Sequence, residues 1–201
     1  MVDLHMHTNY SDGEFAPLDV LKKCEGIGLD VISITDHDIC KAYYDFDKVN
    51  IKDYFSGRIV KGVELTTLFE GRVIEILGYD IDVDIMQEWL GTAYTPEKKQ
   101  ERIEFCRNTT VDNLEKMGIK IDRDKLDTSI AFDAAIYKEV MNEDNREILG
   151  DDILMSIKNF YRLGITNPSS PLFIDMSRFR PDPKFITDLV HKSGGKTFLA
   201  H

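Results

Sequence analysis

The chain has 201 residues, of which 42% are hydrophobic, and this content is enough to bury a sizeable core. Its formal net charge of −11 argues against broad binding to nucleic-acid backbones and against duplex DNA as a partner. Bound cations can still reverse the local charge of an acidic pocket, so a nucleotide substrate is compatible with this composition. The sequence predicts no membrane partner, because it contains no apolar run long enough for a span and no signal-peptide pattern.

The three cysteines, Cys24, Cys40 and Cys106, are widely spaced and form no Cys-x-x-Cys pair. This spacing supports neither a zinc ribbon nor a redox motif. Unpaired cysteines are typical of a reducing compartment, so we expect a cytoplasmic protein.

Residues 2–7 alternate between apolar and polar side chains, as in a strand with one packed face. The polar face carries Asp3, His5 and His7, and the two imidazoles lie one pleat apart, close enough to hold one metal ion. Asp12 follows on the next loop and can bring a carboxylate over the end of the strand. A His-x-His pair is weak evidence by itself, because surface histidines on an amphipathic strand show the same pattern.

A helix is predicted after this loop, beginning at Pro17 and ending at Gly28, because Leu18, Leu21, Cys24 and Ile27 recur at helical spacing. An apolar strand at residues 30–35 follows at once. Residues 1–37 therefore predict a βαβ unit with parallel strands.

Three further apolar segments carry residues that can bind metal at or near their C-terminal ends. The first ends in Asp36, His37 and Asp38, the second in Glu64, and the third in His201. Parallel α/β folds place their chemistry at the carboxyl ends of strands. We therefore expect these side chains to converge with those of the N-terminal strand.

Strands at residues 59–68 and 73–79 flank a Glu70-Gly71 turn, which predicts an antiparallel hairpin with Glu75 in its second strand. From about residue 85 the periodicity becomes helical, with helices expected near 85–90, 96–117, 131–142 and 151–163. A final helix at 182–192 precedes a buried strand at 196–200. We thus expect a first domain segment at 1–84, a helical insertion at 85–182 and a return to the first domain at 183–201.

The order and spacing of these motifs resemble the PHP (polymerase and histidinol phosphatase) superfamily, and most closely its stand-alone TrpH-like metal-dependent phosphoesterases. The resemblance rests on His5-x-His7, Asp12, the segment Thr35-Asp36-His37-Asp38, Glu64 and the Leu199-Ala200-His201 ending. It implies an α/β fold, a distorted (β/α)7 TIM-like barrel with a helical inserted domain. The barrel is expected to be incomplete at the C-terminus, because this family continues for several more strands.

The resemblance also implies a set of metal ligands. His5, His7 and Glu64 would hold a first ion, and Glu64 would bridge to a second ion completed by Glu75 and His201. Asp12 and His37 would begin a third site. The family usually has histidine where this chain has Glu75, so this residue marks either a harder ligand or an altered site.

Three other carboxylates, Asp3, Asp36 and Asp38, are expected to orient the ligating imidazoles rather than to bind metal. For Asp3, a structural hydrogen bond is an equally good interpretation. Lys99, Arg102 and Arg107 in the insertion are candidates for contacts with a substrate phosphate. A solvated charged face explains each of these three cations equally well.

The implied activity is hydrolysis of a small phosphomonoester, a nucleotide or a short RNA end. The nucleophile would be a hydroxide bridging two or three divalent cations (manganese, iron or zinc, with magnesium as an alternative), without a side-chain nucleophile. A histidinol-phosphatase-like enzyme is one alternative. A non-catalytic module that binds metal or nucleotide is another, and the departure at Glu75 motivates it. Which metal is bound, what the leaving group is and how the chain oligomerises are left open.

Overall fold

The computed structural model describes residues 1–141 and 143–201 and divides the chain into two compact units. The first unit consists of Met1–Phe69, Val73–Thr95 and Arg180–His201. The second consists of Glu70–Arg72 and Pro96–Phe179. Helix α3 (Val83–Ala93) belongs to the first unit, because Met86 and Leu90 are buried in its core.

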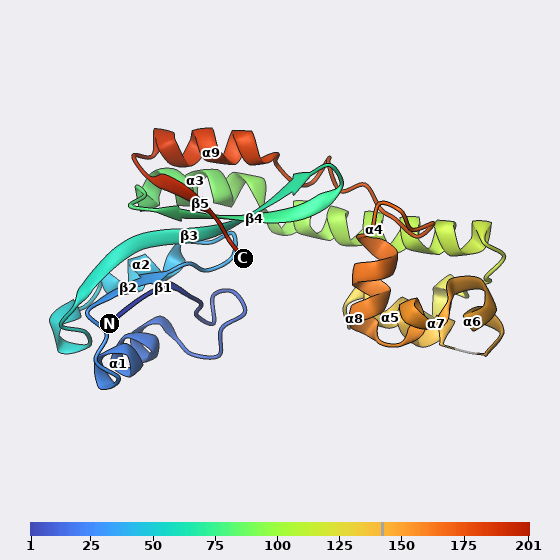
Figure 1. The fold of residues 1–201 in the computed structure, drawn as a ribbon, viewed down its shortest axis with the longest axis horizontal. Helices are drawn as coiled ribbons and strands as arrows, with labels where there is room; N and C mark the ends of the chain where they lie inside the picture. Colours follow the sequence, from blue (N-terminus) through green and yellow to red (C-terminus); the bar gives the residue numbers. More distant parts are fainter. Residues whose placement is uncertain (142) are drawn as a thin grey trace. The chain divides into compact units, whose positions relative to one another are not determined.

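The first unit is built on a five-stranded sheet in the order β1-β2-β3-β4-β5 (Figure 1). The strands are β1 (Val2–Met6), β2 (Val31–Ile34), β3 (Arg58–Phe69), β4 (Arg72–Tyr79) and β5 (Lys196–Leu199). Strands β1, β2 and β3 are parallel, as the βαβ pattern predicts, whereas β5 runs antiparallel to β4. The described residues thus form a mixed α/β fold, and closure into a TIM-like barrel stays a prediction.

The expected hairpin is present, with β3 and β4 adjacent in the sheet and joined at Glu70 and Gly71. Both turn residues have positive φ angles, 50° at Glu70 and 77° at Gly71. Two consecutive left-handed residues match the right-handed twist of the strands that they connect.

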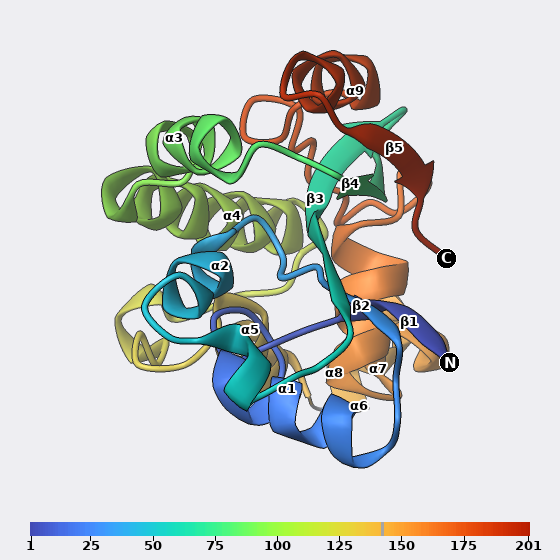
Figure 2. The same cartoon turned by 90° about the vertical axis from the view of Figure 1, so that its left-hand side faces the viewer.

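Helices cover one side of these strands (Figure 2). They are α1 (Pro17–Gly26), α2 (Lys41–Phe46), α3 and α9 (Pro183–Lys192), and α9 contacts β3 and β5. A short 3-10 turn, η1 (Ile51–Asp53), follows α2. Apolar residues of these helices share one core with Val63 and Leu65 of β3. Because strand residues alternate, Glu64 between them points to the opposite face of the sheet.

Strand β5 is more exposed than the sequence predicted. Phe198 and Leu199 are 56% and 68% exposed, so the expectation of a buried strand at 196–200 is wrong. The reason is its position, since β5 is the last strand in the sheet order and pairs with β4 alone among the described strands.

The second unit is helical and has its own core, which includes Leu114, Ile136, Leu154 and Phe160. Its long helix α4 (Pro96–Lys116), close to the expected helix at 96–117, buries Cys106, Thr110, Val111 and Leu114. The other elements are η2 (Arg123–Lys125), α5 (Phe132–Val140), α6 (Glu143–Leu149), α7 (Asp151–Leu154), α8 (Ile157–Asn159) and η3 (Phe160–Ile165). Within the described ranges, no helix is both long and apolar enough to cross a membrane.

Candidate metal centre

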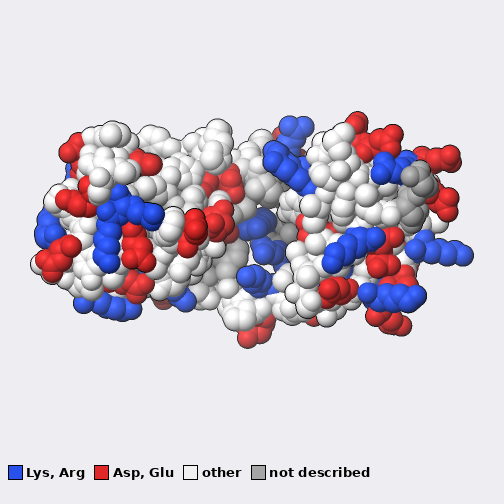
Figure 3. Space-filling view, turned by 90° about the horizontal axis from the view of Figure 1, so that it is seen from below, with Lys and Arg blue, Asp and Glu red and all other residues white. Residues whose placement is uncertain are grey.

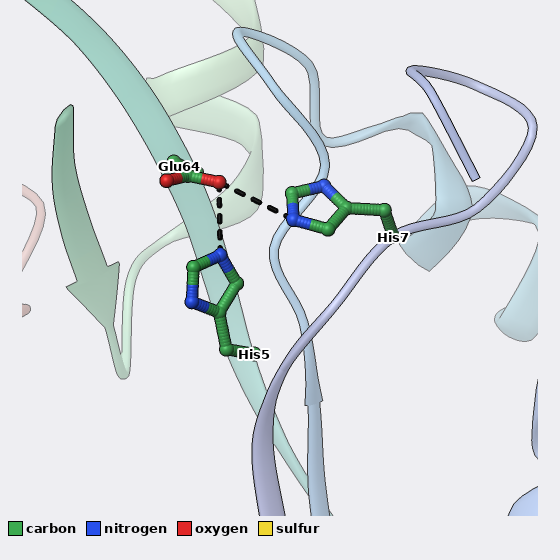
Figure 4. A group of neighbouring side chains, drawn as sticks. All are labelled: His5, His7 and Glu64. Atoms are coloured by element: carbon green, nitrogen blue, oxygen red, sulfur yellow. Dashed lines mark hydrogen bonds and ion pairs between the residues drawn. The ribbon is translucent and has the colours of Figure 1, made fainter. Parts of the chain in front are cut away.

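The side chains of His5, His7 and Glu64 point toward one another (Figure 4). His5 lies on β1, His7 directly follows β1, and Glu64 lies on β3. Oε2 of Glu64 lies 2.9 Å from Nε2 of His5 and 3.3 Å from Nε2 of His7. The Glu64 side chain is fully buried, so its carboxylate is shielded from solvent.

His37 brings a third imidazole to the same carboxylate. An isolated parallel bridge pairs His37 with Glu64 beyond the end of β2, and the backbone N–H of Asp38 donates to the carbonyl oxygen of Glu64. Nδ1 of His37 lies 3.5 Å from Oε2 of Glu64 and 3.7 Å from Oε1 of Glu75. The centre therefore draws on β1, β3, β4 and the segment after β2.

Asp12 lies above the pair formed by His7 and His37, whose rings stack with centroids 4.6 Å apart. Its Oδ1 is 3.4 Å from Nδ1 of His7, and its Oδ2 is 3.6 Å from Nε2 of His37. The exposed carboxylate of Asp12 thus approaches both rings, and a cation bound between them could contact all three side chains.

Three overlapping groups have all their ligand atoms within 4.8 Å of one another. They are His5 with His7 and Glu64, His7 with Asp12 and His37, and His37 with Glu64 and Glu75. The resemblance joined Glu75 to His201, and this pairing stays a prediction. In the structure Oε1 of Glu75 lies 3.7 Å from Nδ1 of His37, and the backbone carbonyl of Glu75 accepts from the N–H of Ala200, which precedes His201.

His201 lies beside the centre but outside these three groups. Its ring centroid is 5.2 Å from that of His5, and its Nε2 is 3.8 Å from Oε1 of Glu64. The side chain is largely exposed, and its role as a ligand stays a prediction.

The donor set fits divalent cations. Oε1 of Glu64 is buried and has no hydrogen-bond partner among the described residues, and such an atom costs free energy unless something binds it. Burial, followed by the neighbouring imidazole of His37, lowers the pKa of His7, which favours the neutral ring that a metal requires. Imidazoles mixed with carboxylates suit manganese, iron or zinc.

The three neighbouring carboxylates, those of Asp3, Asp36 and Asp38, accept hydrogen bonds from different segments of the chain. Asp3 accepts from the backbone N–H of His5 at 3.2 Å. Asp36 accepts from Thr8 and Ser11, and Asp38 accepts from the backbone N–H of Thr66 at 2.9 Å. Of the three, Asp3 contacts the backbone of a ligating histidine. Orientation of the His37 ring by Asp36 or Asp38 stays a prediction.

Arg180 is a cation beside the centre that the sequence reasoning missed. Its Nη1 lies 3.1 Å from Oδ2 of Asp38, and both side chains are less than a fifth exposed. The guanidinium lies 6.0 Å from the ring centroid of Tyr94. Because 142 positions separate Arg180 from Asp38, no local pattern could have indicated this pair.

The cations proposed from the sequence, Lys99, Arg102 and Arg107, lie on α4 in the second unit. Nε of Arg107 is buried without a hydrogen-bond partner among the described residues. Contact between these side chains and a substrate stays a proposal.

Cys40 follows the Asp36–Asp38 segment but is unsuited to nucleophilic chemistry. It is 1% exposed, and burial, followed by the charge of Asp36, raises the pKa of its thiol to about 12. A protonated, inaccessible thiol is a poor nucleophile.

Comparison with known proteins places this geometry in a family. The profile of the PHP domain matches residues 3–151. The chain belongs to the PHP domain family. The 5'-3' exoribonuclease Rnm of Escherichia coli is 26% identical over 204 aligned residues, which cover 99% of this chain and 64% of that protein. The chain therefore spans somewhat less than two thirds of this PHP relative.

Two solved structures share the fold. An amidohydrolase from Chromobacterium violaceum, solved with sulfate and without metal, has a TM-score of 0.59 at 17% identity. A candidate metal-dependent phosphoesterase from Bifidobacterium adolescentis has a TM-score of 0.56 at 16% identity. Each alignment covers all of this chain and 66% of the other.

Proposed function

We propose that the chain forms the metal-binding part of a metal-dependent phosphoesterase. The observation that carries this proposal is the buried carboxylate of Glu64, which meets three imidazoles and keeps one oxygen without a hydrogen-bond partner among the described residues. A structural role alone would leave this buried oxygen unsatisfied. Membership of the PHP family supports the same assignment.

The candidate ligands form more than one cation site. His5, His7 and Glu64 would hold one ion, and Asp12 with His7 and His37 would hold another. Glu75 would contribute a carboxylate beside His37 and Glu64. Divalent cations bound there supply charge that offsets the phosphate oxygens and lowers the pKa of water.

The substrate we propose is a nucleotide, a short RNA end or another small phosphate ester. The 5'-3' exoribonuclease relatives favour the RNA end. Acidic and basic side chains are interspersed on the face shown in Figure 3, in keeping with the net charge of −11. A net charge of −11 disfavours a long nucleic-acid backbone as the substrate.

Arg180 is the cation of the first unit that we propose for the substrate phosphate. Asp38 holds its Nη1, and a guanidinium has further N–H donors in the same plane for phosphate oxygens. Lys99, Arg102 and Arg107 remain candidates from the second unit. A histidinol-phosphatase-like activity and a non-catalytic metal-binding module are the alternatives.

Phosphate release in the presence of Mn²⁺ tests the proposal. The full natural protein would be assayed with nucleotides, sugar phosphates, histidinol phosphate and a 5'-phosphorylated oligoribonucleotide, the last followed by gel. We expect turnover that EDTA abolishes and that His7→Ala abolishes. The matched control His191→Ala changes an exposed histidine of α9 and should keep activity.

The pattern of results separates the alternatives. Release from histidinol phosphate alone would favour that enzyme class. Mn²⁺ binding without turnover of any substrate would favour the non-catalytic module. Turnover that EDTA and His7→Ala leave unchanged would contradict the metal centre itself.

A further inference from the structure

Asp36 is almost fully buried, at 1% exposed, and its carboxylate accepts three hydrogen bonds from one loop. Oδ1 accepts from the backbone N–H of Thr8 at 2.6 Å and from the hydroxyl of Ser11 at 2.7 Å. Oδ2 accepts from the hydroxyl of Thr8 at 2.7 Å. A buried charge is costly unless it is paired in this way, so these bonds fix the loop strongly to the end of β2.

The loop between His7 and Gly13 carries Asp12, the one exposed carboxylate among the residues of the three candidate groups. The backbone N–H groups of Ser11 and Gly13 both donate to the carbonyl oxygen of Thr8, at 3.1 and 2.9 Å. A Cβ at Gly13 would lie 2.3 Å from the carbonyl oxygen of His7. The loop therefore folds tightly around Thr8, the residue that Asp36 holds through two bonds.

We infer that Asp36 is a positioning residue for the cation site formed by His7, Asp12 and His37. Asp36 directly precedes His37, and its carboxylate holds the loop that presents Asp12. The buried side chain of Asp36 thus fixes the separation between His37, which follows β2, and Asp12 on the loop. This inference rests on the metal centre of the proposed function.

The site formed by His5, His7 and Glu64 provides an internal comparison. His5 and Glu64 lie on strands β1 and β3, outside the loop that Asp36 holds, whereas His7 directly precedes this loop and belongs to both sites. Loss of the hydrogen bonds between Asp36 and the loop, which form the clamp, should therefore weaken the ion near Asp12 much more than the ion near His5. A general loss of stability would weaken both.

Mn²⁺ titration calorimetry, with metal content measured after dialysis, tests the inference on the full natural protein. In Asp36→Ala we expect the binding event that Asp12→Ala also weakens to lose affinity by ~10- to 100-fold. The event that His5→Ala removes should change by less than about threefold. Asp36→Asn keeps an acceptor for Thr8 and Ser11 and should recover part of the affinity.

A double-mutant cycle distinguishes positioning from a structural role. If Asp36 acts through Asp12, then Asp36→Ala should cause no further loss in an Asp12→Ala background. Asp45→Ala is the matched control, because it removes the 2.9 Å hydrogen bond from Tyr10 of the same loop and leaves the bonds to Asp36 in place. An equal loss in both backgrounds, or equal weakening of both ions, would overturn the inference.

Amide hydrogen exchange in EDTA provides a readout that needs no metal. In Asp36→Ala, the amides of Thr8, Ser11 and Gly13 should exchange faster, whereas Asp12→Ala should leave them unchanged. Unchanged exchange in Asp36→Ala would overturn the clamp. If this variant does not fold, Thr8→Val and Ser11→Ala remove the donors singly and should give intermediate effects. A wild-type protein that binds no Mn²⁺ would overturn the proposed function together with the metal role of Asp36.

Discussion

Glu64 is the residue on which the candidate centre depends most. Its carboxylate is buried, belongs to two of the three ligand groups and lies within 3.5 Å of three imidazoles. His5 lies on β1, whereas His7 and His37 follow the ends of β1 and β2, so the edge of the sheet brings these partners to Glu64. Three imidazoles thus converge on one buried side chain, whose Oε1 has no hydrogen-bond partner among the described residues.

Replacing Glu64 with Gln should separate metal binding from folding. The amide has the same shape but no charge, so Mn²⁺ binding should weaken and phosphate release should fall by roughly 100-fold or more. The metal-free variant should be at least as stable as the wild type, because it no longer buries a partly unsatisfied charge. Calorimetry, phosphate assay and thermal unfolding in EDTA would measure these effects. The exposed Glu88→Gln is the control, and unimpaired activity of Glu64→Gln would refute this role.

Glu75 is the candidate ligand that β4 contributes. Its Oε1 lies 3.7 Å from His37 in a group that also contains Glu64. If Glu75 ligates metal, Glu75→Ala should weaken one Mn²⁺ binding event by ~10-fold or more, whereas Glu75→His should retain it. Metal content of the purified variants measures this. Equal metal content in wild type and Glu75→Ala would show that Glu75 is not a ligand.

Among the elements, helix α2 is hydrogen-bonded to strands β2 and β3 through the hydroxyl of Tyr43. Tyr43 is 3% exposed, and its hydroxyl donates to the carbonyl of Ile34 at 2.5 Å and accepts from the N–H of Gly62 at 2.6 Å. This contact links α2 with β2 and β3 just before the residues of the metal centre. It helps to fix the spacing between the strands that carry His37 and Glu64.

Tyr43→Phe should destabilise the protein, because it leaves the buried N–H of Gly62 without its acceptor. The expected loss is about 1–3 kcal/mol in the free energy of unfolding. Urea denaturation would measure it. Tyr44→Phe is a matched control, since its hydroxyl bonds to Asp84 at an exposed site and should cost no more than about 0.5 kcal/mol. Equal losses in the two variants would contradict the proposed link.

For the whole molecule, the two units have separate cores, and the candidate metal centre lies in the first. Ligand binding stabilises the structure that forms the site. Removal of metal should therefore act on the first unit selectively. The helical second unit should keep its stability.

Thermal unfolding with and without Mn²⁺ tests this selectivity. Mn²⁺ at 100 times its Kd should stabilise the first unit by ~2.7 kcal/mol, and EDTA should reverse the shift. Circular dichroism, together with the fluorescence of Trp89 in the first unit, would follow the transitions. His7→Ala should remove the shift. The same shift in this variant, or a shift confined to the second unit, would contradict the assignment.

The sequence alone predicted most elements of the fold. Strand alternation at residues 2–7, helical spacing after Pro17 and the Glu70-Gly71 turn each correspond to an observed element. These patterns are local, so neighbouring residues suffice to determine them. Helix α6 was not predicted, because its sequence is largely polar and shows little periodicity.

The residues of the centre were also predicted, since strand ends in parallel folds converge at one edge. The sequence thus determined which residue types meet and which family they belong to. Only the tertiary structure decided that Glu75 lies beside His37, that Asp36 holds the Asp12 loop and that Arg180 pairs with Asp38. These partners depend on strand register and on contacts between residues far apart in the chain, and no local pattern encodes such distances.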